Sequence, residues 1–162
     1  MIGQKKERYT EAFARIDSSI SSEHYFEAIT IEESIISDRI ASFLDSMDLL
    51  KVDDLHRQSF ASLTTLWKFA VLSPGAIWEP CEGLIKEVDE WRKLRNRYVH
   101  GLVKFPHQRA NIPTTKEFLR GAKDAAEKGN ELSRSVSDWR SRQVSIKRRH
   151  NKTQQRTCDA PR

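Results

Sequence analysis

The chain has 162 residues, of which 38% are hydrophobic and 31% are charged, and its net charge is +5. This length and balance are typical of one globular domain and exclude a fibrous or low-complexity chain. No apolar run approaches the roughly 20 residues of a membrane-spanning helix, so we expect a cytoplasmic protein. The two cysteines, Cys81 and Cys158, lack the spacing of a zinc site or a disulfide framework. We therefore expect no metal and no cofactor.

The positive charge is concentrated at the C-terminus. Residues 140–162 contain eight Lys and Arg residues against Asp159 alone, so this segment has a net charge of +7 and the rest of the chain −2. Because residues 141–162 contain almost no apolar side chains, we predict a disordered basic tail there, separate from a helical domain over residues 1–140. Such a tail is either a solubilising terminus or an arm that makes non-specific phosphate contacts with RNA.

The hydrophobic pattern before that tail is helical, and no stretch alternates as a half-buried strand would. Apolar residues recur every three or four positions, and Pro and Gly are confined mainly to the connections. In chain order, the predicted helices cover about residues 5–17, 23–48, 55–72, 80–100 and 115–139. We therefore predict an all-α fold, an antiparallel bundle of four long helices with an additional N-terminal helix.

Capping signals mark the ends of these helices. We expect the serines at 21–22 to cap the second helix and the aspartates at 53–54 to cap the third, because short polar side chains accept hydrogen bonds from the first free N–H groups. Thr114 and Glu117 have the spacing of a capping box at the start of the last helix. Gly101 is placed to end the fourth helix in a left-handed conformation.

The fourth predicted helix carries an arginine in an unusual position. At about 100° per residue, its apolar side chains form one continuous arc, and Arg95 lies near the middle of that arc. Asn96 and His100, four residues apart, share one edge of it. A guanidinium directed into a core is costly unless it is paired. Either Glu32 or Glu33, in the apolar arc of the second helix, is placed to be the partner.

The pattern Arg95-Asn96-x-x-x-His100 resembles the hallmark motif of the HEPN superfamily of small all-helical domains. A chance match of this form is expected about 0.01 times in a chain of this composition. The resemblance covers about residues 5–140 and is generic outside the motif. It implies a metal-independent RNA-cleaving domain that dimerises so that two motifs face each other. Many members are toxins or phage-defence effectors, and others have lost catalysis.

The residue types in the motif suit RNA cleavage, because RNA carries its own nucleophile, the 2′-OH beside each phosphate. An imidazole with a pKa near 6.5 can serve as base or acid, which is the role we assign to His100. The planar fork of Arg95 can bind two phosphate oxygens, and Asn96 can hold the imidazole or a phosphate oxygen. Each chain has one candidate proton-transfer histidine where the reaction needs a base and an acid, which predicts a two-fold dimer.

Four further residues are candidates for substrate contact. Arg92 precedes the motif on its helix and Arg97 lies between Asn96 and His100, and His107 and Arg109 lie in the loop that follows. The leading hypothesis is a homodimeric, metal-independent endoribonuclease of the toxin or antiviral-defence kind, with RNA as substrate and a cognate antitoxin or regulatory partner. One alternative is a non-catalytic HEPN-like dimerisation or RNA-binding module that keeps these residues for structure. A DNA-binding helical protein gains support only from the basic tail.

Overall fold

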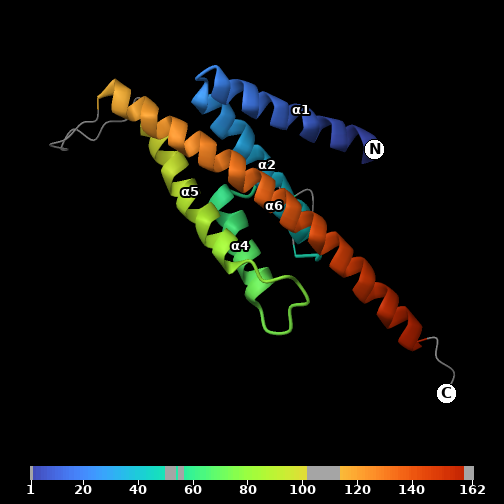
Figure 1. Ribbon diagram of the computed structural model, residues 1–162. Coiled ribbons are helices and arrows are strands. Elements are labelled where there is room, and N and C mark those ends of the chain that lie inside the picture. The colour runs from blue at the N-terminus through green and yellow to red at the C-terminus, as the bar shows by residue number, and fades with distance from the viewer. Residues whose placement is uncertain (1, 50–53, 55–56, 102–113, 159–162) are drawn as a thin grey trace.

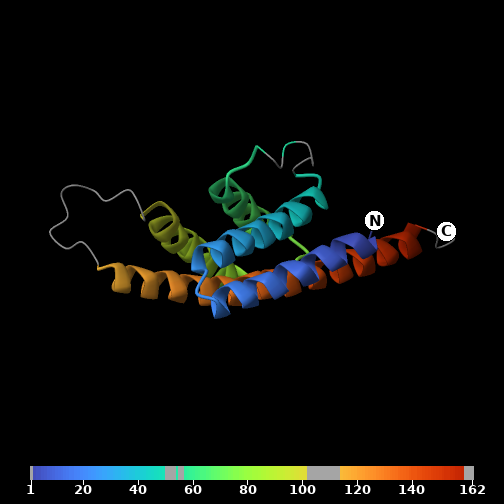
Figure 2. The same ribbon diagram turned by 90° about the horizontal axis from the view of Figure 1, so that it is seen from above.

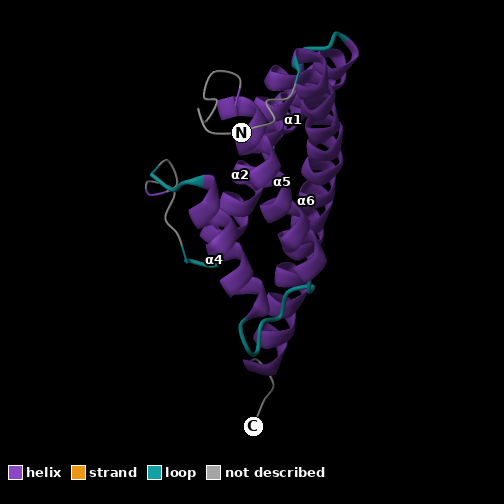
Figure 3. Ribbon diagram, turned by 90° about the vertical axis from the view of Figure 1, so that its left-hand side faces the viewer, coloured by secondary structure: helices purple, strands orange, loops and turns teal. Residues whose placement is uncertain are grey.

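The computed structural model describes residues 2–49, 54, 57–101 and 114–158, and this part of the chain contains no strand (Figure 3). Its helices are α1 (Ile2–Ser21), α2 (Tyr25–Asp45), α4 (Phe60–Leu72), α5 (Glu82–Gly101) and α6 (Thr115–Cys158). None of them is long and apolar enough to cross a membrane. The predicted all-α class is confirmed.

Four of the helices form a bundle, and the fifth lies on its outside (Figure 1). Figure 2 shows α2 between α4 and α6, and α5 completes the bundle by packing against both α4 and α6. The N-terminal helix α1 packs on α2 and α6 from outside. The predicted arrangement of four long helices plus an N-terminal one is therefore present.

The bundle is not antiparallel throughout, as was predicted, because α2 and α6 run in the same direction (Figure 1). Contacts between them advance together along both helices: Arg39 Nε donates to Ser137 Oγ at 3.2 Å, and Arg140 Nη2 donates to the Ser42 carbonyl oxygen at 3.2 Å. In an antiparallel pair, residues further along one helix would contact residues earlier in the other. Helix α4 starts beside the middle of α2 and not at its end, because the Phe60 ring packs on Trp91, which lies with Glu32 beside Gly129.

Three tryptophans fill the centre of the bundle. Trp67 of α4, Trp91 of α5 and Trp139 of α6 are each at most 2% exposed. The ring centroid of Trp139 lies 5.2 Å from that of Trp67 and 4.7 Å from that of Phe43, both in edge-to-face geometry that aromatic pairs prefer. Trp91 Nε1 donates to the Ala125 carbonyl oxygen at 2.8 Å, so this indole also ties α5 to α6.

Local signals predicted some helix ends and not others. The capping box is confirmed, since the Glu117 N–H donates to Thr114 Oγ1 at 3.2 Å and the Thr114 N–H to Glu117 Oε2 at 2.8 Å. The α2 cap expected at 21–22 is wrong: Glu23 has a φ of 62°, and the helix begins at Tyr25 after this turn.

The other two expected ends also differ from the structure. Helix α4 begins at Phe60, later than predicted, and Ser59 caps it by accepting the Ser62 N–H at 3.1 Å. Asp53, one of the two aspartates expected to cap this helix, lies outside the described residues. Gly101 is the last residue of α5, but it does not have the positive φ that the sequence predicted.

The last helix is much longer than the sequence predicts. It was expected to end near Trp139, with a disordered tail over residues 141–162, but α6 continues without a break to Cys158. The prediction of disorder is therefore wrong for residues 141–158, and residues 159–162 lie outside the described part. A scarcity of apolar side chains does not prevent a helix here, because Arg, Lys and Gln have high helix propensity.

Contacts with the connection between α4 and α5 and with the end of α2 hold the first turns of this unexpected segment. Gln143 is only 1% exposed, and its Oε1 accepts the Glu79 N–H at 3.0 Å. Lys147 Nζ donates to the Ser46 carbonyl oxygen, which lies at the C-terminal end of α2. A cation there is favourable because the last carbonyl groups of a helix carry a partial negative charge.

Gly129 of α6 provides a test of the packing between α2, α5 and α6. A Cβ at this position would overlap the carboxyl group of Glu32 and lie 2.7 Å from Trp91 Cζ2. We expect Gly129→Ala to lower the free energy of unfolding by about 1–3 kcal/mol, the usual cost of overpacking. Urea unfolding followed by circular dichroism measures this change.

Gly83 of α5 is the matched control, because a Cβ there would meet nothing within 4 Å. Gly83→Ala should raise the free energy of unfolding by up to about 1 kcal/mol, since alanine forms helix more readily than glycine. Equal stability of the two variants would contradict the close approach at Gly129.

Candidate functional site

Both terminal nitrogens of the Arg95 guanidinium have a hydrogen-bond partner. It projects from α5 towards α2, where Nη2 forms an ion pair with the Glu33 carboxylate, and Nη1 donates to Asn96 Oδ1 at 2.7 Å. The side chains of Arg95 and Glu33 are only 18% and 21% exposed. This is the interhelical pairing that the arginine's place in the apolar arc required.

Glu32 takes a different direction from its neighbour Glu33. Its side chain is fully buried between α2 and α6, beside Gly129 and Trp91. Neither carboxyl oxygen has a hydrogen-bond partner among the described residues. Burial raises the pKa of Glu32 from 4.5 to about 9, so the group is neutral at physiological pH. Of the two glutamates named as partners of Arg95, the structure therefore pairs only Glu33.

Asn96 and His100 lie on the same edge of α5 but in different surroundings. Asn96 is half-buried and its side-chain oxygen is directed to Arg95, while His100 is exposed in the last turn of the helix. The contact between Arg95 and Asn96 was missed because adjacent helix residues are about 100° apart and do not normally face each other. The helix thus carries a half-buried guanidinium at Arg95 and an exposed imidazole five residues further along, at His100.

Aromatic packing holds the end of α5 that carries His100. The hydroxyl of Tyr98 lies against Gly121 of α6, where a Cβ would overlap it. The Tyr98 ring is also 5.4 Å from the Phe118 ring in edge-to-face geometry. These positioning residues were not singled out from the sequence, although a glycine inside a helix is a signal of close approach.

The four candidate substrate contacts are not equally available. Arg92 donates to Asp89 Oδ1 from Nε at 3.0 Å and from Nη2 at 2.8 Å, so it already has an ion-pair partner. Asp89 also pairs with Lys93 at 2.7 Å, and these two cations hold the pKa of its carboxyl below the usual range. Arg97 is exposed. His107 and Arg109 lie outside the described residues.

No group of three or more His, Cys, Asp or Glu side chains that could hold a metal ion occurs in the part of the chain that the structure describes. Comparison with family models, with characterised proteins and with solved structures finds no match for this chain. The resemblance to the HEPN superfamily therefore depends on the motif of Arg95, Asn96 and His100 and on the helical layout.

Glu32 should give the protein's stability a distinctive dependence on pH. Its carboxyl stays neutral in the folded protein up to about pH 9 but ionises near pH 4.5 in the unfolded chain. The unfolded state is therefore increasingly favoured as pH rises between these values. We expect Glu32→Gln, which cannot ionise, to gain roughly 1 kcal/mol of stability per pH unit relative to wild type from pH 5 to 8.

Urea unfolding of both proteins at pH 5, 6, 7 and 8 measures this difference. Glu11→Gln is the control, because Glu11 is 73% exposed on α1, and it should follow the wild-type pH profile. The same pH profile for wild type and Glu32→Gln would show that Glu32 is ionised in the folded protein.

Proposed function

We propose that this chain is a metal-independent endoribonuclease that acts as a homodimer. The observation that carries the proposal is a guanidinium that is held in place by Glu33 and Asn96 while an exposed imidazole, His100, follows it on the same helix. The two groups are separated by five residues, or about 7.5 Å along the helix axis. That spacing suits one group that contacts a phosphate and one that transfers a proton beside it.

The proposed reaction uses the nucleophile of RNA itself. A base takes the proton of a 2′-OH, the 2′ oxygen attacks the adjacent phosphorus, and the bond from phosphorus to the 5′ oxygen breaks. An acid then protonates the leaving 5′ oxygen, so the products are a 2′,3′-cyclic phosphate and a 5′-OH end. His100 transfers a proton, and Arg95 stabilises the negative charge that develops on the phosphoryl oxygens.

A dimer provides the second proton-transfer group that this reaction needs. Each chain offers one exposed histidine on the same helix as the arginine, and a two-fold axis near the end of α5 would place two copies of His100 across one phosphate. The resemblance to HEPN domains supports the same arrangement. It also supports a role as a toxin or antiviral effector that a cognate partner restrains.

A non-catalytic module is the second candidate, and a specific contact favours it. The Arg95 guanidinium already has a carboxylate and a carboxamide partner, which is sufficient to explain a half-buried arginine without any substrate. In this reading, the motif connects α5 to α2, and the helix ends serve dimerisation or RNA binding.

The assembly proposal has its own test. Light scattering at micromolar concentration should give a mass about twice that of the 18.8 kDa chain. When wild type is mixed with excess His100→Ala chains, cleavage should fall with the square of the wild-type fraction, because a composite site needs both histidines. A monomer with full cleavage activity would contradict the composite site, as would a linear fall on mixing.

The catalytic proposal predicts that His100→Ala lowers RNA cleavage by at least about 10²-fold, the usual contribution of a positioned proton-transfer group. Arg95→Lys should have a similar effect, because it keeps the charge and loses the two-pronged contact with phosphate. Cleavage rates measured on a labelled RNA with EDTA present, together with analysis of the product ends, check both expectations.

His24→Ala is the matched control, because His24 is an exposed histidine at the start of α2, and it should cleave like wild type. Wild-type cleavage by His100→Ala, or loss of activity in EDTA, would refute the enzyme and leave the non-catalytic module as the better account.

A further inference from the structure

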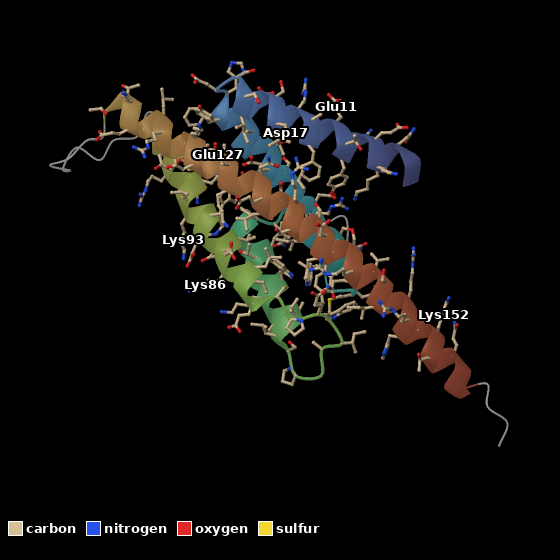
Figure 4. The ribbon with its side chains drawn as sticks, in the orientation of Figure 1. Glu11, Asp17, Lys86, Lys93, Glu127 and Lys152 are labelled. Carbon is tan, nitrogen blue, oxygen red and sulfur yellow. The ribbon has the colours of Figure 1, made fainter. Side chains whose placement is uncertain are left out.

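Beyond its contacts with α2, α6 continues as a strongly cationic helix. Between positions 140 and 158 the chain contains seven Lys and Arg residues and no Asp or Glu. In Figure 1 the last turns of α6 project away from the other helices, and Figure 4 places Lys152 on this projecting part. The charge is therefore displayed on a helix and not on a disordered tail.

Three exposed cations share one side of this projection. At about 100° per residue, Arg148, Arg149 and Lys152 fall within an arc of roughly 100°. We call these three residues the cationic arc. None of them forms an ion pair within the described residues. By contrast, Lys86 and Lys123 each lie within 4.0 Å of a glutamate four residues further along their helix.

A hollow of about 210 Å³ adjoins the cationic arc. Its wall includes the cations Arg140, Lys147 and Arg148 and the amides of Gln143 and Asn151. No carboxylate of the described residues lines it. Arg148 belongs to both features, so the hollow and the arc form one continuous surface of positive charge.

We propose that this surface binds the phosphate backbone of RNA without reading its sequence. Arg148 and Lys152 are about 6 Å apart along the helix axis, and closely spaced cations of this kind neutralise successive phosphates of a nucleic acid. Because the segment is already helical, binding does not require it to fold first. The choice of RNA as the polyanion depends on the function proposed above.

The same surface is poorly suited to a membrane. A helix that lies in a lipid interface needs a broad apolar face opposite its cations. All side chains described from Arg148 to Gln155 are polar and exposed, so this stretch offers no such face. Charge alone would have to attract an anionic lipid surface to these residues, and this is the alternative that the experiment must distinguish from RNA.

The position of the surface indicates what it contributes. Arg148 lies 27 residues beyond Gly121, against which the end of α5 packs, so about 40 Å of α6 separate the cationic arc from the region of His100. This distance is too great for the arc to touch a phosphate held at His100 of the same chain. The arc should therefore lower KM for RNA and leave kcat unchanged.

The experiment measures binding of 2′-O-methyl RNA, which lacks the 2′-OH nucleophile, by fluorescence anisotropy from 50 to 300 mM salt. For Arg148→Gln/Arg149→Gln/Lys152→Gln, we expect a salt-dependence slope smaller by about 2–3 than that of wild type, because each lost phosphate contact removes roughly one unit. Affinity at the lowest salt should fall at least tenfold.

The matched control is Arg15→Gln/Lys86→Gln/Lys123→Gln, which removes the same charge from exposed positions that pair with a glutamate on their own helix. This control should keep the wild-type slope. Arg148→Lys/Arg149→Lys should also keep it, since phosphate contact depends on charge here and not on arginine geometry. Circular dichroism of each variant verifies that the helix content is unchanged.

A wild-type slope in the triple Gln variant of the arc would overturn the proposal, as would an equal loss in the control. Binding to phosphatidylserine vesicles without binding to RNA would overturn it in favour of a membrane. If 2′-O-methyl RNA binds through the arc but no RNA is cleaved, the endoribonuclease is refuted and the binding surface stands. Cleavage with a normal KM in the arc variant would refute the surface alone.

Discussion

The close approach of α2, α5 and α6 at Gly129 is the constraint on which the rest of the structure depends. The absence of a side chain there lets the carboxyl group of Glu32 and the ring of Trp91 occupy the space between the helices. Trp91 in turn donates a hydrogen bond across to the backbone of α6. Because this contact sets the rotation of α2, the next residue, Glu33, faces α5 and meets Arg95.

The neighbouring residues Glu32 and Glu33 thus differ in burial and in charge. Glu32 is buried without a partner in the described structure and is neutral, whereas Glu33 keeps some exposure and pairs with a guanidinium. The neutral carboxyl is a continuing cost to stability as pH rises, and the ion pair fixes a cation near the end of α5. The arrangement is consistent with a catalytic arginine and with a purely structural one, because an ion pair that orients a side chain does not exclude a substrate.

Helix α6 connects the two surfaces to which we assign a function. Its first turns, which include Phe118 and Gly121, pack against Tyr98 near the end of α5 that carries His100, and its last turns carry exposed cations. A single continuous helix keeps these regions at a constant separation. Under the proposed function, binding and cleavage of RNA depend on separate regions of this helix, so a change in one need not alter the other.

Much of the fold class could be predicted from the sequence because helix formation is governed by nearby residues. The apolar period, the capping box of Thr114 and Glu117, and the anomalous place of Arg95 in an apolar arc all depend on spacings within a few turns. The motif could be recognised for the same reason, since its members lie within six residues of one helix.

Other features depend on residues far apart in the chain and were decided only by the tertiary structure. Glu32 and Glu33 both lie in the apolar arc of α2, so the choice of partner for Arg95 required the positions of α5 and α6. The parallel course of α2 and α6 depends on contacts between residues 98 positions apart, such as Arg39 with Ser137. The continuation of α6 past Trp139 is supported by contacts of Gln143 and Lys147 with segments distant in the sequence. The amino-acid composition around these two residues does not predict such contacts.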